Sequence, residues 1–439
     1  MKEALSKLVK EFLKVTENKP IRVISHYDTD GITSAAIITK TLQRANKKFS
    51  LRIVKGLDFN TIQQELSRNK KEILLFVDLG SGNLDSFQNL ENPIFILDHH
   101  ELNKEKLNDK IKIINPHLFH EEEICGAGIC YLFSKEISSK NQDLSALALI
   151  GMIGDRHETQ LSKIYQQIIN DTEGIEVKKS LLIFSATRPL RKSLEYSSAF
   201  YIPGVTGSSK GVTELLRENE ISGEKTLYEL TEDEISKLVT SISVRIASAG
   251  EKAEIIGNIY LLKFYNRKED IRELSVLINA CSRLGHPDLA LSFCLQYEFA
   301  KEKAQDLYIQ YKQELVNSLK KAETMEKING NGFVIMNAKD LIKDTIIGTV
   351  TSILSSSLDH QEGTVLVGMA YNQDKIKVSA RIYGRKGKNL KEVLEKTINL
   401  TNMIAEVGGH QKAAGCLIKK EDEELFIKEL RRNLEIQIS

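Results

Sequence analysis

The chain has 439 residues, more than the roughly 250–300 at which a single hydrophobic core stops growing, so two or three domains are expected. Its 61 Lys and Arg against 60 Asp and Glu give a net charge of +1, which excludes a uniformly basic nucleic-acid-binding protein but not local clusters of charge. Apolar residues make up 41% and charged residues 28%, which is typical of a folded soluble protein rather than a disordered chain.

Segments that would direct the chain to a membrane or to an oxidising compartment are not predicted. The longest apolar patch, ALALIGMIG at 146–154, is far shorter than the ~20 residues of a membrane span. The first 15 residues have apolar positions at helical spacing and lack the apolar core of a signal peptide. The five Cys contain no C-x-x-C pair, which indicates reduced thiols and argues against a zinc site. We therefore expect a cytoplasmic protein without a membrane partner.

The first 160 residues alternate short apolar runs with helical patterns. The apolar runs predict strands at 21–26, 51–56, 72–78, 94–99 and 111–115. Helical patterns at 32–45 and 59–69 separate the first three of these runs. Continuous apolar runs joined by amphipathic helices indicate a parallel sheet covered on both faces. The sequence therefore predicts an α/β fold, with a doubly wound parallel-sheet domain over 1–188.

The pattern changes in the middle of the chain and changes again near its end. From about 160 to 325 it is charged and mostly helical, which predicts a helical inserted region over 189–326 that ends in one long linker helix. Strand-like segments then return at 332–337, 363–371 and 375–383, before a helical pattern at 389–407. These segments predict a smaller α/β C-terminal domain over 327–439.

Carboxylate and imidazole side chains gather where the predicted strands of the first domain end, and one more follows the apolar run LIGMIG. They are His26, Asp28, Asp30, Asp78, Asp98, His99, His100 and Asp155. In an open parallel sheet the carboxyl ends of the strands meet at one edge, and ligands bind there. We therefore expect these side chains to lie close together.

Four carboxylates in this set, Asp28, Asp30, Asp78 and Asp155, indicate a metal site. Packed together without cations they would repel and raise one another's pKa, whereas two divalent cations would neutralise them. The mixture of Asp and His favours Mn²⁺, with Mg²⁺ or Co²⁺ as alternatives. Two such ions can hold a hydroxide nucleophile and clamp a phosphoryl oxygen, which predicts hydrolysis of a phosphate ester or anhydride. Each element alone is weak, since D-x-D is common in loops and DHH can cap a turn, but their occurrence in order is specific.

These motifs resemble those of the DHH phosphoesterase superfamily. The four motifs are SHYDTDGITSAA at 25–36, FVDLGSG at 76–82, LDHH at 97–100 and GMIGD at 151–155. The segment GGHQKAAG at 408–415 is similar to the signature of the DHH-associated C-terminal domain. The resemblance covers both ends of the chain, and its combined motifs are highly specific.

The resemblance implies two ions that share one carboxylate. One ion would be held by His26, Asp28 and a bridging Asp78. The other would share Asp78 and take three further ligands, which are Asp30, His99 and Asp155.

The resemblance also implies roles for the remaining two residues of the DHH motif. His100 would face the substrate phosphate and stabilise charge in the transition state. Asp98 would orient a histidine. A water held between the two ions would be the nucleophile, without a covalent enzyme intermediate.

The C-terminal motif implies a substrate-binding site. Gly408 and Gly409 would let backbone N–H groups approach a phosphate, and His410 would donate a hydrogen bond to it. Members of the family often have three glycines before this histidine, and Val407 stands in place of the first here, which leaves the loop conformation open. A glycine-containing turn before a strand is the alternative interpretation.

The region 375–396 has eight Lys and Arg against two Glu. This local excess predicts a track for the backbone of a single strand, and Arg381 is the residue that we expect to contact a phosphate directly. A solvated charged hairpin is the alternative.

The domain order resembles that of the archaeal RecJ-like exonucleases, which carry an inserted region between the two end domains. Relatives of this shape associate with the GINS complex of the replication machinery, so GINS or the replicative helicase is a candidate partner. The hypothesis is a metal-dependent exonuclease in DNA replication or repair that hydrolyses single-stranded DNA to nucleoside 5′-monophosphates, with RNA as a further candidate substrate.

Two alternatives stay open. One is a short-oligonucleotide nuclease of the nanoRNase type or a 3′-phosphoadenosine-5′-phosphate phosphatase. The other is a replisome scaffold protein that binds GINS, a role taken by relatives that have lost their metal ligands. Every ligand position is filled here, which counts against a purely structural role.

Overall fold

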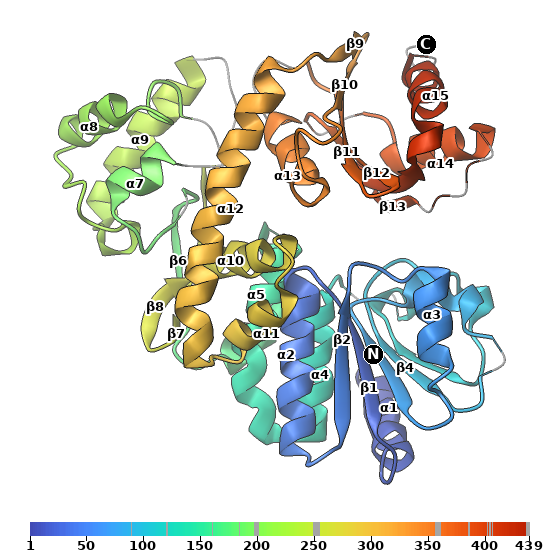
Figure 1. Ribbon diagram of the computed structural model, residues 1–439. Coiled ribbons are helices and arrows are strands. Elements are labelled where there is room, and N and C mark those ends of the chain that lie inside the picture. The colour runs from blue at the N-terminus through green and yellow to red at the C-terminus, as the bar shows by residue number, and fades with distance from the viewer. Residues whose placement is uncertain are drawn as a thin grey trace. The chain divides into compact units, whose positions relative to one another are not determined.

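The structure is a computed structural model, and it divides into two compact units, Met1–Tyr308 and Ile309–Ser439 (Figure 1). The described residues are 1–88, 90–119, 122–159, 161–183, 185–196, 202–248, 255–355, 361–384, 387–401, 403, 405 and 407–435.

A five-stranded parallel sheet is the centre of the first unit. Its strands lie in the order β2-β1-β3-β4-β5, and every pairing between neighbours is parallel. The strands are β1 (Ile21–His26), β2 (Phe49–Val54), β3 (Ile73–Val77), β4 (Ile94–Leu97) and β5 (Ile111–Ile114). The chain runs from β1 outward to β2 and then returns to the other side at β3, so the order reverses between β1 and β3. This arrangement confirms the predicted doubly wound sheet, and such a reversal is where ligands bind in these folds.

Helices cover both faces of this sheet. On one face Phe12 packs edge-on against Phe95 of β4 and Phe133 of the covering helix, with ring centroids 5.1 and 5.2 Å apart. On the other face Ile62 joins a buried apolar cluster with Phe76 of β3. Burial on both sides explains why the strands are continuous apolar runs in the sequence. The helices are α1 (Lys2–Val15), α2 (Thr29–Arg44) and α4 (Gly126–Ile137) on the first face and α3 (Phe59–Leu66) on the second.

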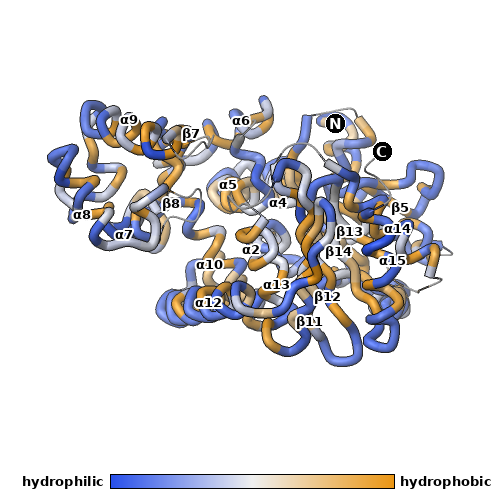
Figure 2. Tube along the Cα trace, turned by 90° about the horizontal axis from the view of Figure 1, so that it is seen from above, coloured by the Kyte–Doolittle hydropathy of each residue, from blue (hydrophilic) through white to orange (hydrophobic). Residues whose placement is uncertain are grey.

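Four more helices of the first unit surround α2 and α4. They are α5 (Ser145–Gly154), α6 (Lys163–Asp171), α10 (Ile271–Arg283) and α11 (Pro287–Cys294). α5 is almost entirely buried, and its tube is mostly in the hydrophobic colour of Figure 2. The Thr29 hydroxyl donates to the Ser275 carbonyl at 2.8 Å, which fastens α10 to the first turn of α2.

The middle of the chain contains a sheet that the sequence analysis did not predict. The antiparallel strands β6 (Glu176–Leu181), β7 (Ile256–Phe264) and β8 (Arg267–Asp270) lie in the order β6-β7-β8. Charged, largely exposed residues occupy much of β6 and β8, so neither strand appears as an apolar run. Three helices, α7 (Leu190–Glu195), α8 (Ser209–Glu218) and α9 (Glu232–Ser248), share one apolar cluster with β6 and β7.

The predicted linker helix is α12 (Glu298–Thr324), which begins in the first unit and ends in the second. The second unit is a six-stranded sheet in the order β13-β14-β12-β11-β10-β9, in which only the pair β10 and β11 is parallel. This confirms the predicted smaller α/β domain. Its elements are β9 (Ile328–Gly330), β10 (Phe333–Asn337), α13 (Asp344–Ser355), β11 (Val365–Asn372), β12 (Lys375–Ile382), α14 (Leu390–Thr401), β13 (Val407–His410), β14 (Ala413–Lys419) and α15 (Glu423–Glu435).

Within the described part of the chain, no helix has both the length and the apolar character needed to cross a membrane. The domain boundaries expected at 188 and 326 stay predictions.

Candidate metal centre

The predicted ligands lie together at the carboxyl edge of the parallel sheet. His26 is the last residue of β1, and Asp78 follows β3 directly. Asp28 is the residue before α2, and its carboxylate accepts a hydrogen bond from the Gly31 N–H at 3.0 Å. Asp155 lies just past the end of α5. The topology therefore gathers side chains that are far apart in the sequence.

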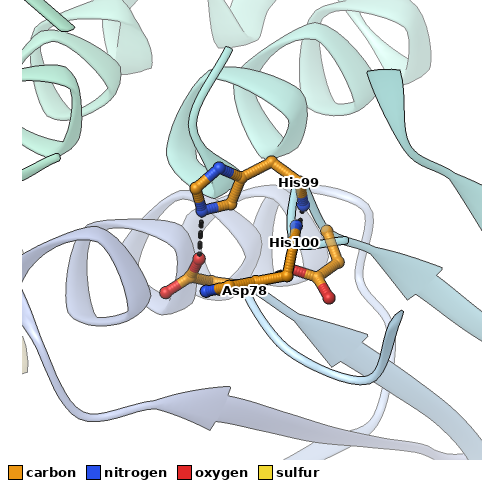
Figure 3. Close-up of side chains that lie close together, drawn as sticks. Asp78, His99 and His100 are labelled. Carbon is orange, nitrogen blue, oxygen red and sulfur yellow. Dashed lines mark hydrogen bonds and ion pairs between the residues drawn. The ribbon is translucent and has the colours of Figure 1, made fainter. Parts of the chain in front are cut away.

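Asp78 occupies the centre of the cluster. It is buried, and its backbone is in the left-handed region with φ 57°, a conformation that its N–H supports by donating to the Leu97 carbonyl at 2.8 Å. Its Oδ2 lies 3.6 Å from His26 Nδ1, and its Oδ1 lies 3.3 Å from His99 Nε2, toward which Figure 3 shows it turned. Neither oxygen has a hydrogen-bond partner among the residues that the structure describes. Buried carboxylate oxygens without a hydrogen-bond partner are suitable ligands for a cation.

One group of ligand atoms forms around His26. Its Nδ1 lies 3.0 Å from Asp28 Oδ2, and the ligand atoms of His26, Asp28 and Asp78 all lie within 4.8 Å of one another. Like the Asp78 oxygens, His26 Nδ1 is buried without a hydrogen-bond partner in the described part of the chain. This group matches the first of the two predicted ion sites.

A second group forms around His99. Its Nε2 lies 3.2 Å from Asp155 Oδ2, 3.3 Å from Asp78 Oδ1 and 3.8 Å from Asp30 Oδ2. Burial disfavours a charged ring, but the nearby carboxylates of Asp78, Asp155 and Asp30 outweigh it and raise the pKa of His99. One imidazole thus faces three carboxylates, as predicted for the second ion site.

The carboxylates perturb one another in the absence of a cation. Burial, opposed by His99 and reinforced by the charges of Asp78 and Asp28, raises the pKa of Asp155 to about 7. Burial and the charges of Asp78 and Asp155 also raise the pKa of Asp30. A divalent cation would replace the protons that this cluster otherwise retains.

Asp30 is fixed by the first turn of α4. Its Oδ2 accepts a hydrogen bond from the Gly126 N–H at 2.6 Å, and its Oδ1 accepts one from the Ala127 N–H at 2.9 Å. A helix N-terminus stabilises a negative charge in this way. A Cβ built at Gly126 would lie 2.7 Å from Asp78 Cβ, and one at Gly151 would lie 2.6 Å from Asp30 Oδ1. The sequence analysis gave neither glycine a role, although Gly126 begins the small-residue run GAG at 126–128 and Gly151 begins the motif GMIGD at 151–155.

Asp98 contacts the histidines of its own motif. It is fully buried, and it accepts hydrogen bonds from the N–H groups of Ser81 and His99, both at 2.8 Å. Its Oδ1 lies 2.7 Å from His100 Nδ1. Burial raises the pKa of Asp98, but the contact with His100 outweighs it and lowers the pKa to about 2. The geometry suits a carboxylate that orients a histidine.

His100 leaves part of its ring accessible. Its side chain is 47% exposed. Burial opposes a charged ring, but the hydrogen bond to Asp98 outweighs burial and raises the pKa of His100. An accessible imidazole can donate a hydrogen bond to a phosphate oxygen.

His157 also reaches the cluster, although the sequence analysis gave it no role. One of its ring nitrogens lies within 4.8 Å of the ligand atoms of His99 and Asp155. Burial and the neighbouring His99 lower the pKa of His157. Its position two residues after Asp155 was the only sequence signal.

The predicted substrate contacts lie in the second unit. Arg381 is half-buried on β12, where its Nε donates to the Ser352 hydroxyl and its Nη1 donates to the Ala380 carbonyl, both at 2.8 Å. Of the basic region around it, Arg385 and Lys386 lie outside the described residues.

Gly408 and Gly409 lie exposed on β13. Gly409 has φ 114°, and a Cβ there would lie 2.3 Å from the Ala413 carbonyl oxygen, so this position requires glycine. The backbone of His410 pairs with Ala413, and its side chain lies outside the described residues.

Comparison with known proteins agrees with this fold. Models of three domains match the chain: the N-terminal domain of the DHH family over 20–154, the DHH-CID domain over 183–259 and the DHHA1 domain over 331–435. The chain therefore belongs to the DHH superfamily.

Individual relatives extend over nearly the whole chain. An uncharacterized protein of Methanocaldococcus jannaschii is 26% identical over 443 residues, which cover 97% of this chain and 95% of the relative. The crystal structure of RecJ from Thermus thermophilus in complex with Mn²⁺ matches with a TM-score of 0.61 and 18% identity, over 98% of this chain and 54% of that one. CDC45 from Entamoeba histolytica matches with a TM-score of 0.68 and 12% identity, over 98% and 99%. At these identities the two structures establish a RecJ-like fold.

Proposed function

We propose that this protein is a metal-dependent exonuclease that hydrolyses single-stranded DNA, with RNA as a further substrate, to nucleoside 5′-monophosphates. The observation that supports this most strongly is the buried Asp78 carboxylate between two groups of ligands. Both of its oxygens face imidazole nitrogens, and neither has a hydrogen-bond partner within the described ranges. The membership in the DHH superfamily and the RecJ-like fold support the same reaction class.

Two Mn²⁺ ions are the proposed cofactors, with Mg²⁺ or Co²⁺ as alternatives. Two bound divalent cations supply a hydroxide nucleophile at neutral pH and neutralise the charge of the phosphoryl oxygens. His26 and Asp28 would hold one ion, Asp78 would bridge, and the remaining ligands would hold the other. Those remaining ligands are Asp30, His99 and Asp155. RecJ from Thermus thermophilus has been solved both with Mn²⁺ and with Mg²⁺, which supports a divalent cation of this kind.

The DHH motif supplies the residues that act on the phosphate itself. His100 would donate a hydrogen bond to a non-bridging phosphate oxygen, where negative charge grows in the transition state. Asp98 would keep the His100 ring in place through the 2.7 Å contact with Nδ1. Because Asp98 is fully buried, we do not expect it to contact the substrate.

The second unit would bind the strand. Arg381, Gly408, Gly409 and His410 are the proposed phosphate contacts, and the basic residues of 375–396 would follow the backbone. The exposed backbone of Gly408 and Gly409 supports this assignment, since an anion can approach it closely.

A non-enzymatic role is the second candidate, and the likeness to CDC45 favours it. In that role the chain would serve as a scaffold that binds the GINS complex or the replicative helicase. The complete set of metal ligands favours the enzyme. A short-oligonucleotide nuclease or a 3′-phosphoadenosine-5′-phosphate phosphatase would use the same ligands. Substrate length separates the first from the exonuclease, and hydrolysis of a phosphate monoester separates the second.

The test uses purified chain, Mn²⁺ and end-labelled strands of DNA and RNA, with a dinucleotide and 3′-phosphoadenosine-5′-phosphate alongside. We expect mononucleotides from long single strands, no attack on duplex and no reaction in EDTA. Immediate release of the 5′ label as mononucleotide would indicate 5′→3′ polarity, and an initial ladder would indicate the reverse. Cleavage restricted to the dinucleotide or to 3′-phosphoadenosine-5′-phosphate would replace the exonuclease by the short-oligonucleotide nuclease or the phosphatase, respectively, and no hydrolysis at all would favour the scaffold.

A further inference from the structure

His157 lies beside the metal ligands, after a turn of the chain that contains a left-handed residue. α5 ends at Gly154, and Arg156 has a left-handed backbone with φ 60°. The short helix η5 (His157–Thr159) begins immediately afterwards. A non-glycine residue rarely adopts this backbone conformation, and such residues cluster at functional sites. As a result of this turn, both Asp155 and His157 lie in the cluster of ligands.

The ring of His157 lies where it could bind the same metal ion as His99 and Asp155. Its centroid lies 6.2 Å from that of His99, with the two rings at 76°. The ligand atoms of His99, Asp155 and His157 all lie within 4.8 Å of one another, and His99 Nε2 is 3.2 Å from Asp155 Oδ2. Atoms that bind one ion at about 2.1 Å lie roughly 3 to 4 Å apart. These three side chains therefore need little movement to hold one cation.

Tyr165 determines the orientation of this ring. Its Oη lies 3.0 Å from His157 Nδ1. Tyr165 is fully buried, and the same Oη accepts a hydrogen bond from the Cys125 N–H at 2.7 Å, so the hydroxyl is fixed. A metal-binding histidine usually donates its other ring N–H to such an acceptor. With Nδ1 directed to Tyr165, Nε2 is the nitrogen left for a cation.

The start of α4 supports two side chains of the cluster, Asp30 and His157. Cys125 immediately precedes α4, whose first N–H groups bind the Asp30 carboxylate. The start of α4 thus fixes Asp30 directly and His157 through Tyr165. If His157 only filled space, its ring would need neither the fixed hydroxyl of Tyr165 nor the left-handed turn at Arg156.

We propose that His157 is a further ligand of the cation held by His99 and Asp155, and that Tyr165 is its positioning residue. The assignment rests on the proposed metal-dependent function and adds one ligand to it. A neutral imidazole increases the affinity for the ion without adding to the repulsion among the carboxylates.

Calorimetric titration of the full metal-free chain with Mn²⁺ tests the assignment without any assay of activity. His157→Asn is the decisive variant, because the amide of asparagine takes the place of Nδ1 beside Tyr165 while nothing replaces Nε2. Tyr165→Phe keeps the imidazole and removes the contact that orients it. The matched control is His117→Asn, which changes an exposed histidine of the short helix η3 (Pro116–Leu118).

We expect two binding events in the wild-type chain and in the control. In His157→Asn one event weakens by about 10- to 100-fold while the other is unchanged, and in Tyr165→Phe the same event weakens less. Wild-type binding of both ions by His157→Asn overturns the assignment and leaves the proposed function intact. Absence of Mn²⁺ binding in the wild-type chain overturns both.

Circular dichroism and thermal unfolding in EDTA establish that each variant is folded. If His157→Asn does not fold, Tyr165→Phe decides the question. Unchanged affinity for both ions in Tyr165→Phe then overturns the assignment, because the ring would not depend on the contact that we hold to position it.

Discussion

At the scale of single residues, Asp78 joins the two halves of the site. Its two oxygens face different imidazoles, His26 at 3.6 Å and His99 at 3.3 Å. Its left-handed backbone turns the carboxylate into the cluster directly after β3, and such local strain persists where function requires it. Since neither oxygen has a hydrogen-bond partner in the described part of the chain, the loss of this carboxylate should affect both ions.

Asp78→Asn should weaken the binding of both Mn²⁺ ions by at least about 100-fold, because each ion loses a charged ligand. Asparagine has the same shape and tolerates the left-handed backbone, so the fold should persist. Calorimetric titration gives the affinities. Asp85→Asn is the control, because Asp85 is 70% exposed and pairs with Lys106 away from the cluster. Unchanged affinity for either ion would show that Asp78 does not bridge.

The pKa of about 7 for Asp155 predicts a pH dependence of metal binding. The folded metal-free chain retains a proton there below pH 7, and a cation must displace it. Affinity for Mn²⁺ should therefore rise with pH through 7 and continue to rise above it, because the pKa values of the ligands His26 and His99 are also raised. Titrations in buffers of different ionisation enthalpy measure the released protons. An affinity that is constant across this range would argue against a carboxyl group that titrates there.

At the scale of elements, the first turn of α4 holds the carboxylate cluster in place. Its N–H groups bind Asp30, and Gly126 leaves room for the carboxylates of Asp30 and Asp78. A Cβ at Gly126 would lie 2.7 Å from Asp78 Oδ1 and 2.9 Å from Asp30 Oδ2. Because a helix cannot move away without losing its packing on α2, the ligands would have to give way.

Gly126→Ala should lower stability by about 1–3 kcal/mol through overpacking and weaken Mn²⁺ binding at least tenfold. Thermal unfolding in EDTA and calorimetric titration measure the two effects. Gly82→Ala is the matched control, since a Cβ there would meet no described atom within 4 Å. Equal stability and equal Mn²⁺ affinity of the two variants would show that the close packing around Gly126 does not support the ligands.

The sequence was most informative where one physical signal dominates. The strands of the parallel sheet are buried on both faces, so they appear as apolar runs, and the residues that follow them must meet at one edge. β6 and β8 could not be recognised, because exposed charged residues interrupt them and their pairing with β7 is a tertiary contact. The contact of Asp30 with Gly126 joins residues 96 positions apart, so no local pattern reveals it.

At the scale of the whole molecule, the two chemical tasks fall to different units. The proposed metal ligands and His100, which would face the phosphate that is cleaved, lie in Met1–Tyr308. The residues proposed to bind the rest of the strand, Arg381, Gly408, Gly409 and His410, lie in Ile309–Ser439. The near-neutral net charge of +1 hides this division, since acidic residues gather at the metal ligands and basic residues at 375–396. A substitution in the second unit should therefore weaken substrate binding and leave metal binding unchanged.

Arg381→Gln should raise the KM for long single strands by about tenfold, with less effect on a dinucleotide, because one phosphate contact is lost. Its Mn²⁺ affinity should equal that of the wild-type chain. Steady-state kinetics and titration measure the two quantities, and Lys428→Gln on the exposed face of α15 is the control. A change in Mn²⁺ affinity with unchanged KM would contradict the assignment of Arg381 to the strand.

The central claim is that the cluster around Asp78 hydrolyses phosphodiester bonds. The most direct measurement compares the wild-type chain with Asp78→Asn on one labelled single strand of DNA at saturating Mn²⁺. We expect mononucleotides from the wild-type chain and no product above background from the variant. Equal rates of hydrolysis by the two proteins would contradict it.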